Sequence, residues 1–187
     1  MKILFISDIH GSLPRAQTVF AAADPDSLDA IVILGDILYH GPRNPLPEGY
    51  DPRATAGFLN GYKGRIIAVR GNCDSEVDQT LLEFPIRTDY SWLFLDGMRI
   101  FLTHGHLWNE SNLPPLAAGD AFAYGHTHIP RAHVVNGIGV LNPGSCSLPK
   151  EGNEPSYGLY EDGFFRVLTL DGEVVLERCL YGLCAKA

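Results

Sequence analysis

The sequence predicts a single α/β domain with two β-sheets, and three features of the 187-residue chain support this fold class. The first part alternates continuous apolar segments with segments of helical character, the order typical of β-α-β units. After Pro85 the chain changes to short strands separated by turns. No repeat, low-complexity tract or linker divides it, so we expect residues 1–187 to fold as one domain.

The first part of the chain should form a parallel sheet covered by helices. Ser12, two residues before Pro14, is placed to cap the first helix, and Glu76 and Asp78 put acidic charge in the first turn of the third. Near-continuous apolar strands in this order favour parallel pairing with both faces of the sheet buried. We expect strands at 3–7, 30–34 and 65–69, and helices at 14–23, 52–62 and 75–82.

The second part should be mainly β. The Asp96-Gly97 pair predicts a tight hairpin between strands at 91–95 and 98–103. Further strands are expected at 121–124, 132–135, 139–142, 157–160, 164–170 and 174–180. Between the two early helices, residues 40–52 are rich in proline and glycine. Loops of this length are often functional, although a surface excursion without function stays open.

Composition and charge narrow the classes of partner. A hydrophobic fraction of 45% with 19% charged residues is ordinary for a globular protein. The net charge of −8 and the lack of a Lys/Arg cluster argue against a broad nucleic-acid-binding surface. Bound divalent cations would make one local patch positive, so a phosphate-containing substrate stays compatible with this charge.

The N-terminal segment and the cysteines indicate the cellular compartment of the protein. The first apolar run is too short for a signal-peptide core, and no stretch approaches the roughly 20 apolar residues of a membrane span. The four cysteines (Cys73, Cys146, Cys179 and Cys184) do not form a dense disulfide pattern. We therefore expect reduced thiols in a cytoplasmic protein that has no membrane segment.

Seven potential metal ligands lie in five short patches, each at the end of an apolar run. In parallel α/β sheets such strand ends meet in one crevice, so patches that are distant in sequence can converge. Residues two apart in an extended segment point to the same side, so Asp8 with His10, and His126 with His128, can each aim two ligands at one point. The seven residues are Asp8, His10, Asp36, Asn72, His104, His126 and His128.

This ligand set favours an open two-metal centre. Imidazole and carboxylate suit borderline divalent ions such as manganese, iron or zinc, and the lack of thiolate ligands argues against a structural zinc site. Two adjacent cations can activate water and hold the attacking and leaving oxygens of a displacement at phosphorus. Asp36, which stands alone, is the natural bridging carboxylate. The set therefore predicts metal-dependent phosphoester hydrolysis.

The order of the patches resembles the calcineurin-like metallophosphoesterases, whose signature is Asp-x-His, Gly-Asp, Gly-Asn-His-Asp/Glu, His and Gly-His-x-His. Within that family the chain looks closest to the small bacterial phosphodiesterases, a likeness that extends to residues 40–44 and 142–145. The resemblance implies two stacked mixed β-sheets flanked by helices, an α/β/β/α sandwich. The matching stretches here are Asp8-Ile9-His10, Gly35-Asp36, Gly71-Asn72-Cys73-Asp74, His104 and Gly125-His126-Thr127-His128.

The resemblance also implies roles for these residues. The first metal would be held by Asp8, His10, Asp36 and His128, and the second by Asp36, Asn72, His104 and His126. A hydroxide that bridges the two ions would attack a small phosphodiester without a covalent enzyme intermediate. Manganese is the expected metal, with zinc, iron or nickel as alternatives, and the family likeness suggests a homo-oligomer.

Cys73 departs from the signature, because many family members have histidine there. That histidine is credited with stabilising the transition state or protonating the leaving group, and a thiol is a poorer acid for an alkoxide. One hypothesis is that the protein favours good leaving groups; another is that His106 or Arg43 supplies the missing donor. A third reading is that Cys73 only packs beside the site. Asp74 can orient a neighbouring group or, with Ser75, cap the next helix.

Two other functions stay open from the sequence. A phosphomonoesterase of the phosphoprotein phosphatase type would have an arginine soon after Gly-Asp, and this chain has Gly35-Asp36-Ile37-Leu38-Tyr39-His40-Gly41 instead. A binding scaffold related to the retromer subunit of this fold would not need the ligands. Because all seven ligands are present, catalysis on a diester is the favoured prediction.

Overall fold

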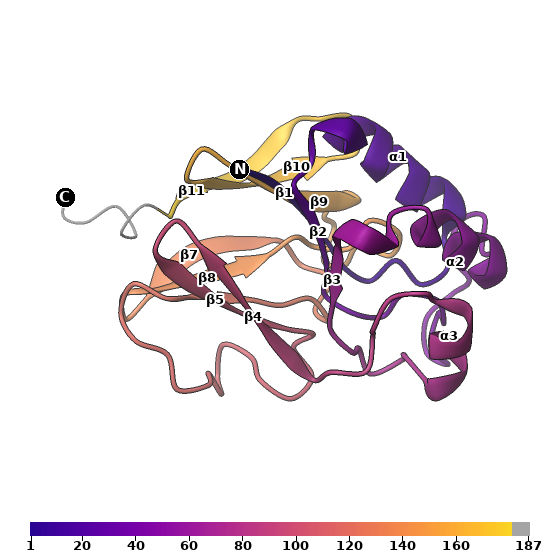
Figure 1. Ribbon diagram of the computed structural model, residues 1–187, viewed down its shortest axis with the longest axis horizontal. Helices are drawn as coiled ribbons and strands as arrows, with labels where there is room; N and C mark the ends of the chain where they lie inside the picture. The colour runs from indigo at the N-terminus through magenta and orange to yellow at the C-terminus, as the bar shows by residue number, and fades with distance from the viewer. Residues whose placement is uncertain (181–187) are drawn as a thin grey trace.

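The computed structural model describes residues 1–180, which form two stacked mixed β-sheets with helices against the first (Figure 1). The first sheet has the strand order β11-β10-β9-β1-β2-β3. Strands β1, β2 and β3 pair in parallel, whereas β9, β10 and β11 add on in antiparallel pairs. Its strands are β1 (Lys2–Ile6), β2 (Ala30–Ile33), β3 (Ile66–Ala68), β9 (Ser156–Glu161), β10 (Phe164–Thr169) and β11 (Val174–Cys179).

The second sheet has the order β4-β5-β6-β8-β7. Its three inner strands, β5, β6 and β8, run parallel, and each edge strand pairs with them in antiparallel fashion. The predicted Asp-Gly hairpin joins the first two strands, with Leu95 paired to Met98. The strands are β4 (Tyr90–Leu95), β5 (Met98–Thr103), β6 (Ala121–Ala123), β7 (Arg131–Val135) and β8 (Ile138–Asn142).

Helices α1 (Leu13–Ala23), α2 (Pro52–Asn60) and α3 (Glu76–Leu81) lie on one side of the molecule (Figure 1). Short 3₁₀ helices at Pro25–Ser27 and Lys63–Arg65 lead into β2 and β3. The outer face of the second sheet carries an aromatic cluster that includes Phe101 and Phe122. This cluster is covered by the loop at 104–120, from which Trp108 and Leu113 pack against it. No described helix covers it.

The alternation of side chains along β1 explains the layering. Leu4 and Ile6 belong to the core beneath the helices, whereas Ile3 and Phe5 belong to the core between the two sheets. All four are fully buried, because successive side chains of a strand point to opposite faces and both faces are covered. The two stacked mixed sheets of the predicted fold class are therefore confirmed, with the described helices on the first sheet and none on the outer face of the second. The expected strands and helices all form, with bounds that differ by two residues or fewer.

The predictions for the helix caps and for the cysteines are confirmed only in part. Ser75 caps α3 as predicted, in a capping box with Asp78. Ser12 occupies the cap position of α1, but its hydroxyl donates to the carbonyl of Glu48 at 2.5 Å and not to the helix. Cys73 and Cys146 are free thiols, as expected, whereas Cys179 is disulfide-bonded, which contradicts the expectation of reduced cysteines there. Cys184 lies outside the described residues.

None of the helices in residues 1–180 combines the length and the apolar character that crossing a bilayer requires.

Candidate metal centre

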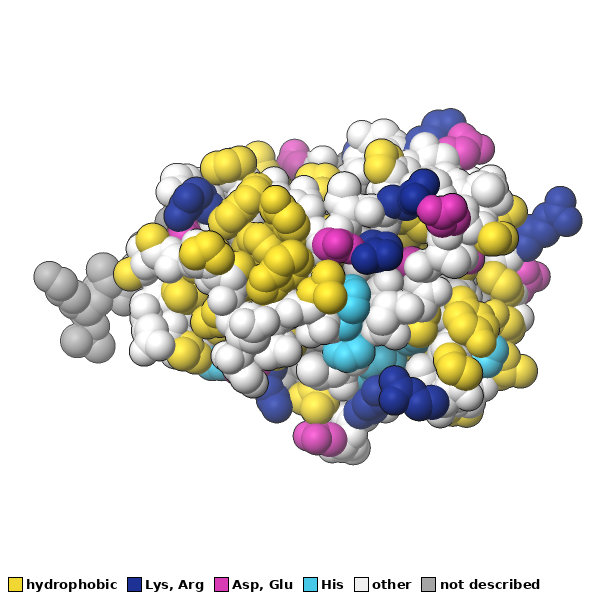
Figure 2. Space-filling view, turned by 90° about the horizontal axis from the view of Figure 1, so that it is seen from below, with side chains coloured by type: hydrophobic (Ala, Val, Ile, Leu, Met, Phe, Trp, Pro, Cys, Tyr) yellow, Lys and Arg dark blue, Asp and Glu magenta, His cyan; other side chains and the backbone are white. Residues whose placement is uncertain are grey.

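The structure brings the seven predicted ligands together at one end of the two sheets. Asp8 follows β1, Asp36 follows β2, Asn72 follows β3, and His104 follows β5. The remaining three are His10, which also follows β1, and His126 and His128, which follow β6, so the carboxyl ends of strands from both sheets contribute. Histidine side chains gather in the middle of this face, beside Lys and Arg side chains (Figure 2).

Asp8, His10 and His128 form the first group of facing ligand atoms. Asp8 Oδ1 lies 3.3 Å from His128 Nε2 and 3.8 Å from His10 Nε2. Both Asp8 Oδ1 and His10 Nε2 are buried and have no hydrogen-bond partner among the described residues. Unpaired buried polar atoms are costly, and a carboxylate oxygen facing imidazole nitrogens is a donor set that a divalent cation would satisfy.

Asp36 joins this group to a second one. Its Oδ2 lies 3.8 Å from His10 Nε2 and 3.5 Å from His104 Nε2. His104 Nε2 is also 3.1 Å from Asn72 Oδ1, and the ring of His126 has its centroid 5.1 Å from that of His104. The position of Asp36 between the two groups is the one that a bridging carboxylate needs.

Hydrogen bonds fix the orientation of three imidazole rings. Nδ1 of His10 donates to the carbonyl of Tyr39 at 2.7 Å, Nδ1 of His104 to Leu34 at 2.6 Å, and Nδ1 of His128 to Leu148 at 2.5 Å. A carbonyl oxygen can only accept, so Nδ1 carries the hydrogen and Nε2 of each neutral ring is left as the ligand atom. Such outer partners orient metal-binding histidines in proteins.

Charges within the centre shift several pKa values. Burial alone would raise the pKa of Asp8, but the close contact with His128 and the charges of the nearby histidines hold it well below its usual range. Burial lowers the pKa of His10. Burial also disfavours the charged form of His104, yet the hydrogen bond to Asp36 and the charges of Asp8 and Asp36 raise its pKa to about 9.

The backbone of the ligand loops is left-handed at five of the seven ligands. The extended geometry expected for the Asp8-His10 and His126-His128 pairs is therefore wrong, although each pair does aim at one point. Non-glycine residues with positive φ cost about 1–3 kcal/mol each and persist where the surroundings fix them, which is common at functional sites. The φ values are 53° for Asp8, 49° for His10, 53° for Asp36, 64° for His126 and 59° for His128.

Two glycines let the ligand loops approach each other closely. A Cβ atom on Gly71 would collide with Oδ1 of Asp36, and one on Gly125 would collide with Oγ of Ser7. Ser7 Oγ in turn donates to Asp8 Oδ2 at 2.7 Å. Glycine is thus required in two of the five patches by steric contact with the centre itself.

Asp74 ties together the loops after β2 and β3. Its carboxylate accepts hydrogen bonds from the backbone N–H groups of Asp36 (2.9 Å), Ile37 (2.8 Å) and Gly71 (2.7 Å). Burial raises the pKa of Asp74 to about 6, against the effect of these hydrogen bonds. The supporting role considered for Asp74 and the capping role of Ser75 therefore exist side by side.

The segment at 142–148 supports the other loops. Asn142 Nδ2 donates to the carbonyl of Gly125 at 2.9 Å, and the hydroxyls of Ser145 and Ser147 donate to the carbonyl of Asp8 at 2.8 and 2.9 Å. Residues 142–145, which belong to the family likeness, therefore border the site.

A central cavity of about 260 Å³ opens over the ligands. It contains Arg43, from the loop whose role the sequence left open, and Lys150, which no sequence pattern singled out. Both side chains are exposed, so this otherwise acidic protein offers two flexible cations beside the cluster. The cavity is lined by Asp36, Gly41, Pro42, Arg43, Asn44, Asn72, Cys73, His126, His128 and Lys150.

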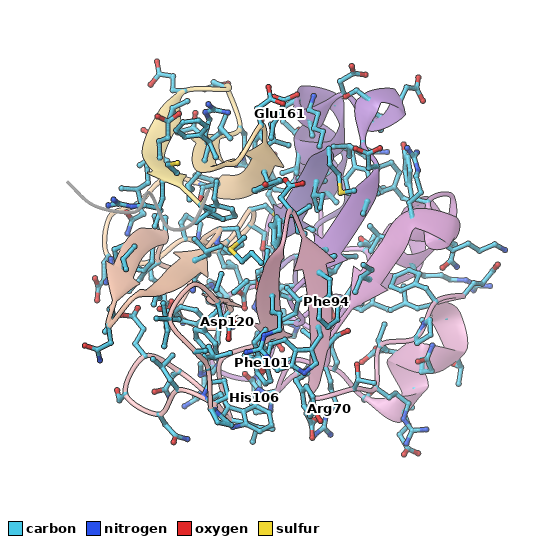
Figure 3. All side chains as sticks on the ribbon, turned by 60° about the vertical axis from the view of Figure 1, so that its left-hand side comes forward. Arg70, Phe94, Phe101, His106, Asp120 and Glu161 are labelled. Atoms are coloured by element: carbon cyan, nitrogen blue, oxygen red, sulfur yellow. The ribbon has the colours of Figure 1, made fainter. Side chains whose placement is uncertain are left out.

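Cys73 and His106 sit at different edges of the cluster. The Cys73 thiol lines the central cavity, accepts a hydrogen bond from Asn72 Nδ2 at 3.2 Å, and has its pKa raised to about 12 by burial and by Asp36. His106 lines a neighbouring cavity, with its ring centroid 5.4 Å from that of His104. Figure 3 shows His106 and Arg70 at the same end of the molecule, with Glu161 at the opposite end.

Comparison with known proteins agrees with this geometry. The sequence model of the calcineurin-like phosphoesterase superfamily domain matches residues 1–162. Phosphodiesterase YfcE of Escherichia coli strain K12 is 49% identical over 176 residues, which cover 94% of this chain and 96% of that protein. A probable metallophosphoesterase of Bacillus subtilis, YsnB, is 28% identical over 185 residues, covering 95% of this chain and 89% of that protein.

Solved structures give the same result. The structure of the E. coli phosphoesterase YfcE has a TM-score of 0.94 and 48% identity, and the match covers 96% of this chain and all of that one. Vacuolar protein sorting 29 from Cryptosporidium parvum has a TM-score of 0.60 at 19% identity over 94% of this chain and 96% of that one, a likeness that shows the fold alone. From the family match and the close relative, the chain belongs to the calcineurin-like phosphoesterase superfamily.

Proposed function

We propose that the protein is a metal-dependent phosphodiesterase that hydrolyses small phosphodiesters. The observation that carries the proposal is the convergence of seven oxygen and nitrogen ligands with Asp36 at their centre, where buried Asp8 Oδ1 and His10 Nε2 have no hydrogen-bond partner within residues 1–180. The 49% identical relative is named a phosphodiesterase, which supports the same reaction class.

In this proposal the ligands form two sets that share Asp36. The first set is Asp8, His10, Asp36 and His128; the second is Asp36, Asn72, His104 and His126. Manganese is the proposed metal, because histidine, carboxylate and amide oxygen ligands suit ions of its class. When bound, two such cations supply a hydroxide nucleophile at neutral pH and neutralise charge on the phosphate oxygens.

The chain's own residues hold the substrate and the ligands in place. Arg43 and Lys150 line the central cavity and attract the phosphate group, Arg43 by a planar fork and Lys150 as a point charge. The side-chain oxygen of Asn72 faces His104 Nε2, and its amide nitrogen donates a hydrogen bond to the Cys73 thiol. His106 and Arg43, which line two neighbouring cavities, are the candidate donors to the leaving-group oxygen.

Turnover of a matched pair of aryl esters tests the reaction class. The manganese-reconstituted protein should hydrolyse bis(p-nitrophenyl) phosphate faster than p-nitrophenyl phosphate. Asp36→Asn and His104→Ala should each lose at least about 100-fold in kcat/KM, since losses of this size follow even from changes to outer partners of metal ligands. Asp171→Asn, a change of the same kind in an exposed turn, is the control and should keep wild-type activity.

The alternatives give different results in the same assay. Faster turnover of the monoester would favour a phosphomonoesterase, and stoichiometric metal without turnover of either ester would favour a binding scaffold. The cytoplasmic location and the homo-oligomeric state stay predictions.

A further inference from the structure

A second cavity, of about 350 Å³, adjoins the central cavity at His126. His126 lines both spaces, and His106 stands in the second one with its ring centroid 5.4 Å from that of His104. We call this space the His126-side cavity. Its walls are Gly105, His106, Asn109, Glu110, Ser111, Tyr124, His126, Thr127, Ile129 and Arg131.

The walls of the His126-side cavity offer uncharged hydrogen-bonding groups. Asn109 uses Oδ1 to accept from the backbone N–H of Ser111 at 2.9 Å, which fixes its amide, and its Nδ2 has no protein partner among the described residues. The Ser111 hydroxyl likewise makes no hydrogen bond within residues 1–180. Thr127 Oγ1 accepts from Asn142 at 3.1 Å and keeps its own hydrogen to donate.

The charges in this cavity are already balanced. The Glu110 carboxylate accepts from the Tyr124 hydroxyl, lies 3.1 Å from His133 Nε2 and lies 4.0 Å from Arg131 Nε. With one carboxylate opposed by one guanidinium, the walls carry no net charge from these two groups. A neutral substituent with hydroxyl groups fits this chemistry better than a cationic or a second anionic one.

A third cavity, which adjoins the central cavity at Cys73, has a different character. It has a volume of about 260 Å³ and is lined mainly by apolar and aromatic side chains, among them Leu38, Tyr39, Tyr50 and Leu81. The phosphate position therefore has a hydrogen-bonding neighbour beside His126 and an apolar neighbour beside Cys73. The two ester substituents of a diester would meet different surroundings.

We propose that the His126-side cavity binds a neutral, hydroxyl-bearing ester arm of the substrate, such as a glycerol or ribose group. This inference rests on the proposed phosphodiesterase function and names the class of diester. Asn109 and Ser111 are the residues that determine this specificity, and they act on substrate affinity.

Diesters with one constant leaving group test the proposal. In p-nitrophenyl phosphodiesters whose second arm is glycerol, a 5′-linked nucleoside or ethyl, release of p-nitrophenolate reports on the second arm alone. The wild-type, manganese-loaded protein should show a lower KM for the glycerol or nucleoside ester than for the ethyl ester. Asn109→Ala and Ser111→Ala should each raise that lower KM by about 3–10-fold, the effect of one hydrogen bond, with little change in kcat.

Asn112→Ala is the matched control, because its side chain donates to the carbonyl of Leu107 within the same loop and does not line the cavity. It should leave the preference between arms unchanged. The proposal is overturned if the wild type shows no preference for a hydroxyl-bearing arm, or if the preference survives both Asn109→Ala and Ser111→Ala. Loss of the preference in Leu81→Ala would assign it to the Cys73 side and also overturn the proposal.

A binding measurement separates this proposal from the function on which it rests. Calorimetry on the manganese-loaded protein should show glycerol 3-phosphate binding about 3–10-fold more tightly than inorganic phosphate, with the advantage lost in Asn109→Ala. That result together with no turnover of any diester would contradict the proposed function and support the cavity assignment. Equal binding of the two ligands, with turnover intact, would contradict the cavity assignment alone.

Discussion

At the residue scale, the centre depends on which nitrogen of each histidine carries a hydrogen. The carbonyls of Tyr39 and Leu148 take the Nδ1 hydrogens of His10 and His128, so the Nε2 atoms face Asp8. His104 has the same arrangement, but its raised pKa places a second proton on Nε2 at neutral pH. A metal that takes the position between His104 and Asp36 must displace that proton.

Metal binding should therefore release protons and strengthen as pH rises. His104 has its pKa raised to about 9, so below pH 9 the metal competes with a bound proton, and its affinity should climb from pH 6 toward pH 9. Isothermal titration of manganese at pH 7 in two buffers of different ionisation enthalpy counts the released protons. Proton uptake, or an affinity that does not change over this range, would contradict the assignment of His104 Nε2 as a ligand.

Two glycine substitutions separate a steric requirement from ordinary helix propensity. Gly71→Ala places a Cβ against Asp36 Oδ1, so we expect destabilisation of about 1–3 kcal/mol, as for other overpacked sites, with weaker metal binding. Gly57 is exposed in α2 with nothing near its Cβ position, so Gly57→Ala should stabilise the protein by about 0.5–1 kcal/mol. Urea unfolding measures both; equal effects of the two changes would refute the steric argument.

Cys73 is the residue through which the leaving group can be tested. With its pKa raised to about 12, the thiol stays protonated and is a weak acid toward an alkoxide. If the protein favours good leaving groups for this reason, Cys73→His should raise kcat/KM on a diester with an alkyl leaving group by about 100-fold, the lower end of what a positioned acid contributes. No gain on that diester would leave His106 or Arg43 as the donor, or Cys73 as a packing residue only.

At the element scale, the ligands are carried by loops that follow strands, and these loops are held by a few supporting side chains. Asp74 joins the loops after β2 and β3 through three backbone N–H groups. Ser145 and Asn142 join the segment after β8 to the loops after β1 and β6. The end of each strand sets the direction in which its loop leaves the sheet. These hydrogen bonds then fix the position of each loop relative to the others.

Asp74→Asn should therefore affect the centre without removing a ligand. An amide in place of the carboxylate turns one acceptor into a donor that faces backbone N–H groups, at a cost of about 1–3 kcal/mol in unfolding free energy. Manganese affinity should fall by about 10–100-fold, as for other outer partners of metal ligands. Urea unfolding and calorimetry check the two effects, with Asp171→Asn as the control. Wild-type values for both would show that Asp74 does not hold the loops.

The strands could be predicted from the sequence, whereas the backbone of the ligand loops could not. Apolar runs and Asp-Gly turns were enough to place the strands, because burial and turn geometry are local properties of the chain. The left-handed backbone at Asp8 and His10 was not predicted, since only contacts from other loops hold a non-glycine residue there. Lys150 follows no strand and belongs to no motif, so only the folded chain places it beside Arg43.

At the scale of the whole molecule, the centre exists because two sheets end at the same place. β1, β2 and β3 of the first sheet and β5 and β6 of the second each deliver at least one ligand. The core between the sheets, which contains Phe5, Leu34 and Leu102, fixes the distance between the two sets of loops. We propose that residues 1–187 form one domain, because neither sheet supplies a complete centre alone.

These loops are expected to hold two divalent cations, and Asp36 is placed to contact both. The most direct test is an anomalous-difference map at the manganese edge from crystals of the manganese-loaded protein. We predict two peaks, one beside Asp8, His10 and His128 and one beside Asn72, His104 and His126, each within ligand distance of Asp36. A single peak, or two peaks of which only one contacts Asp36, would contradict a two-metal centre that shares Asp36.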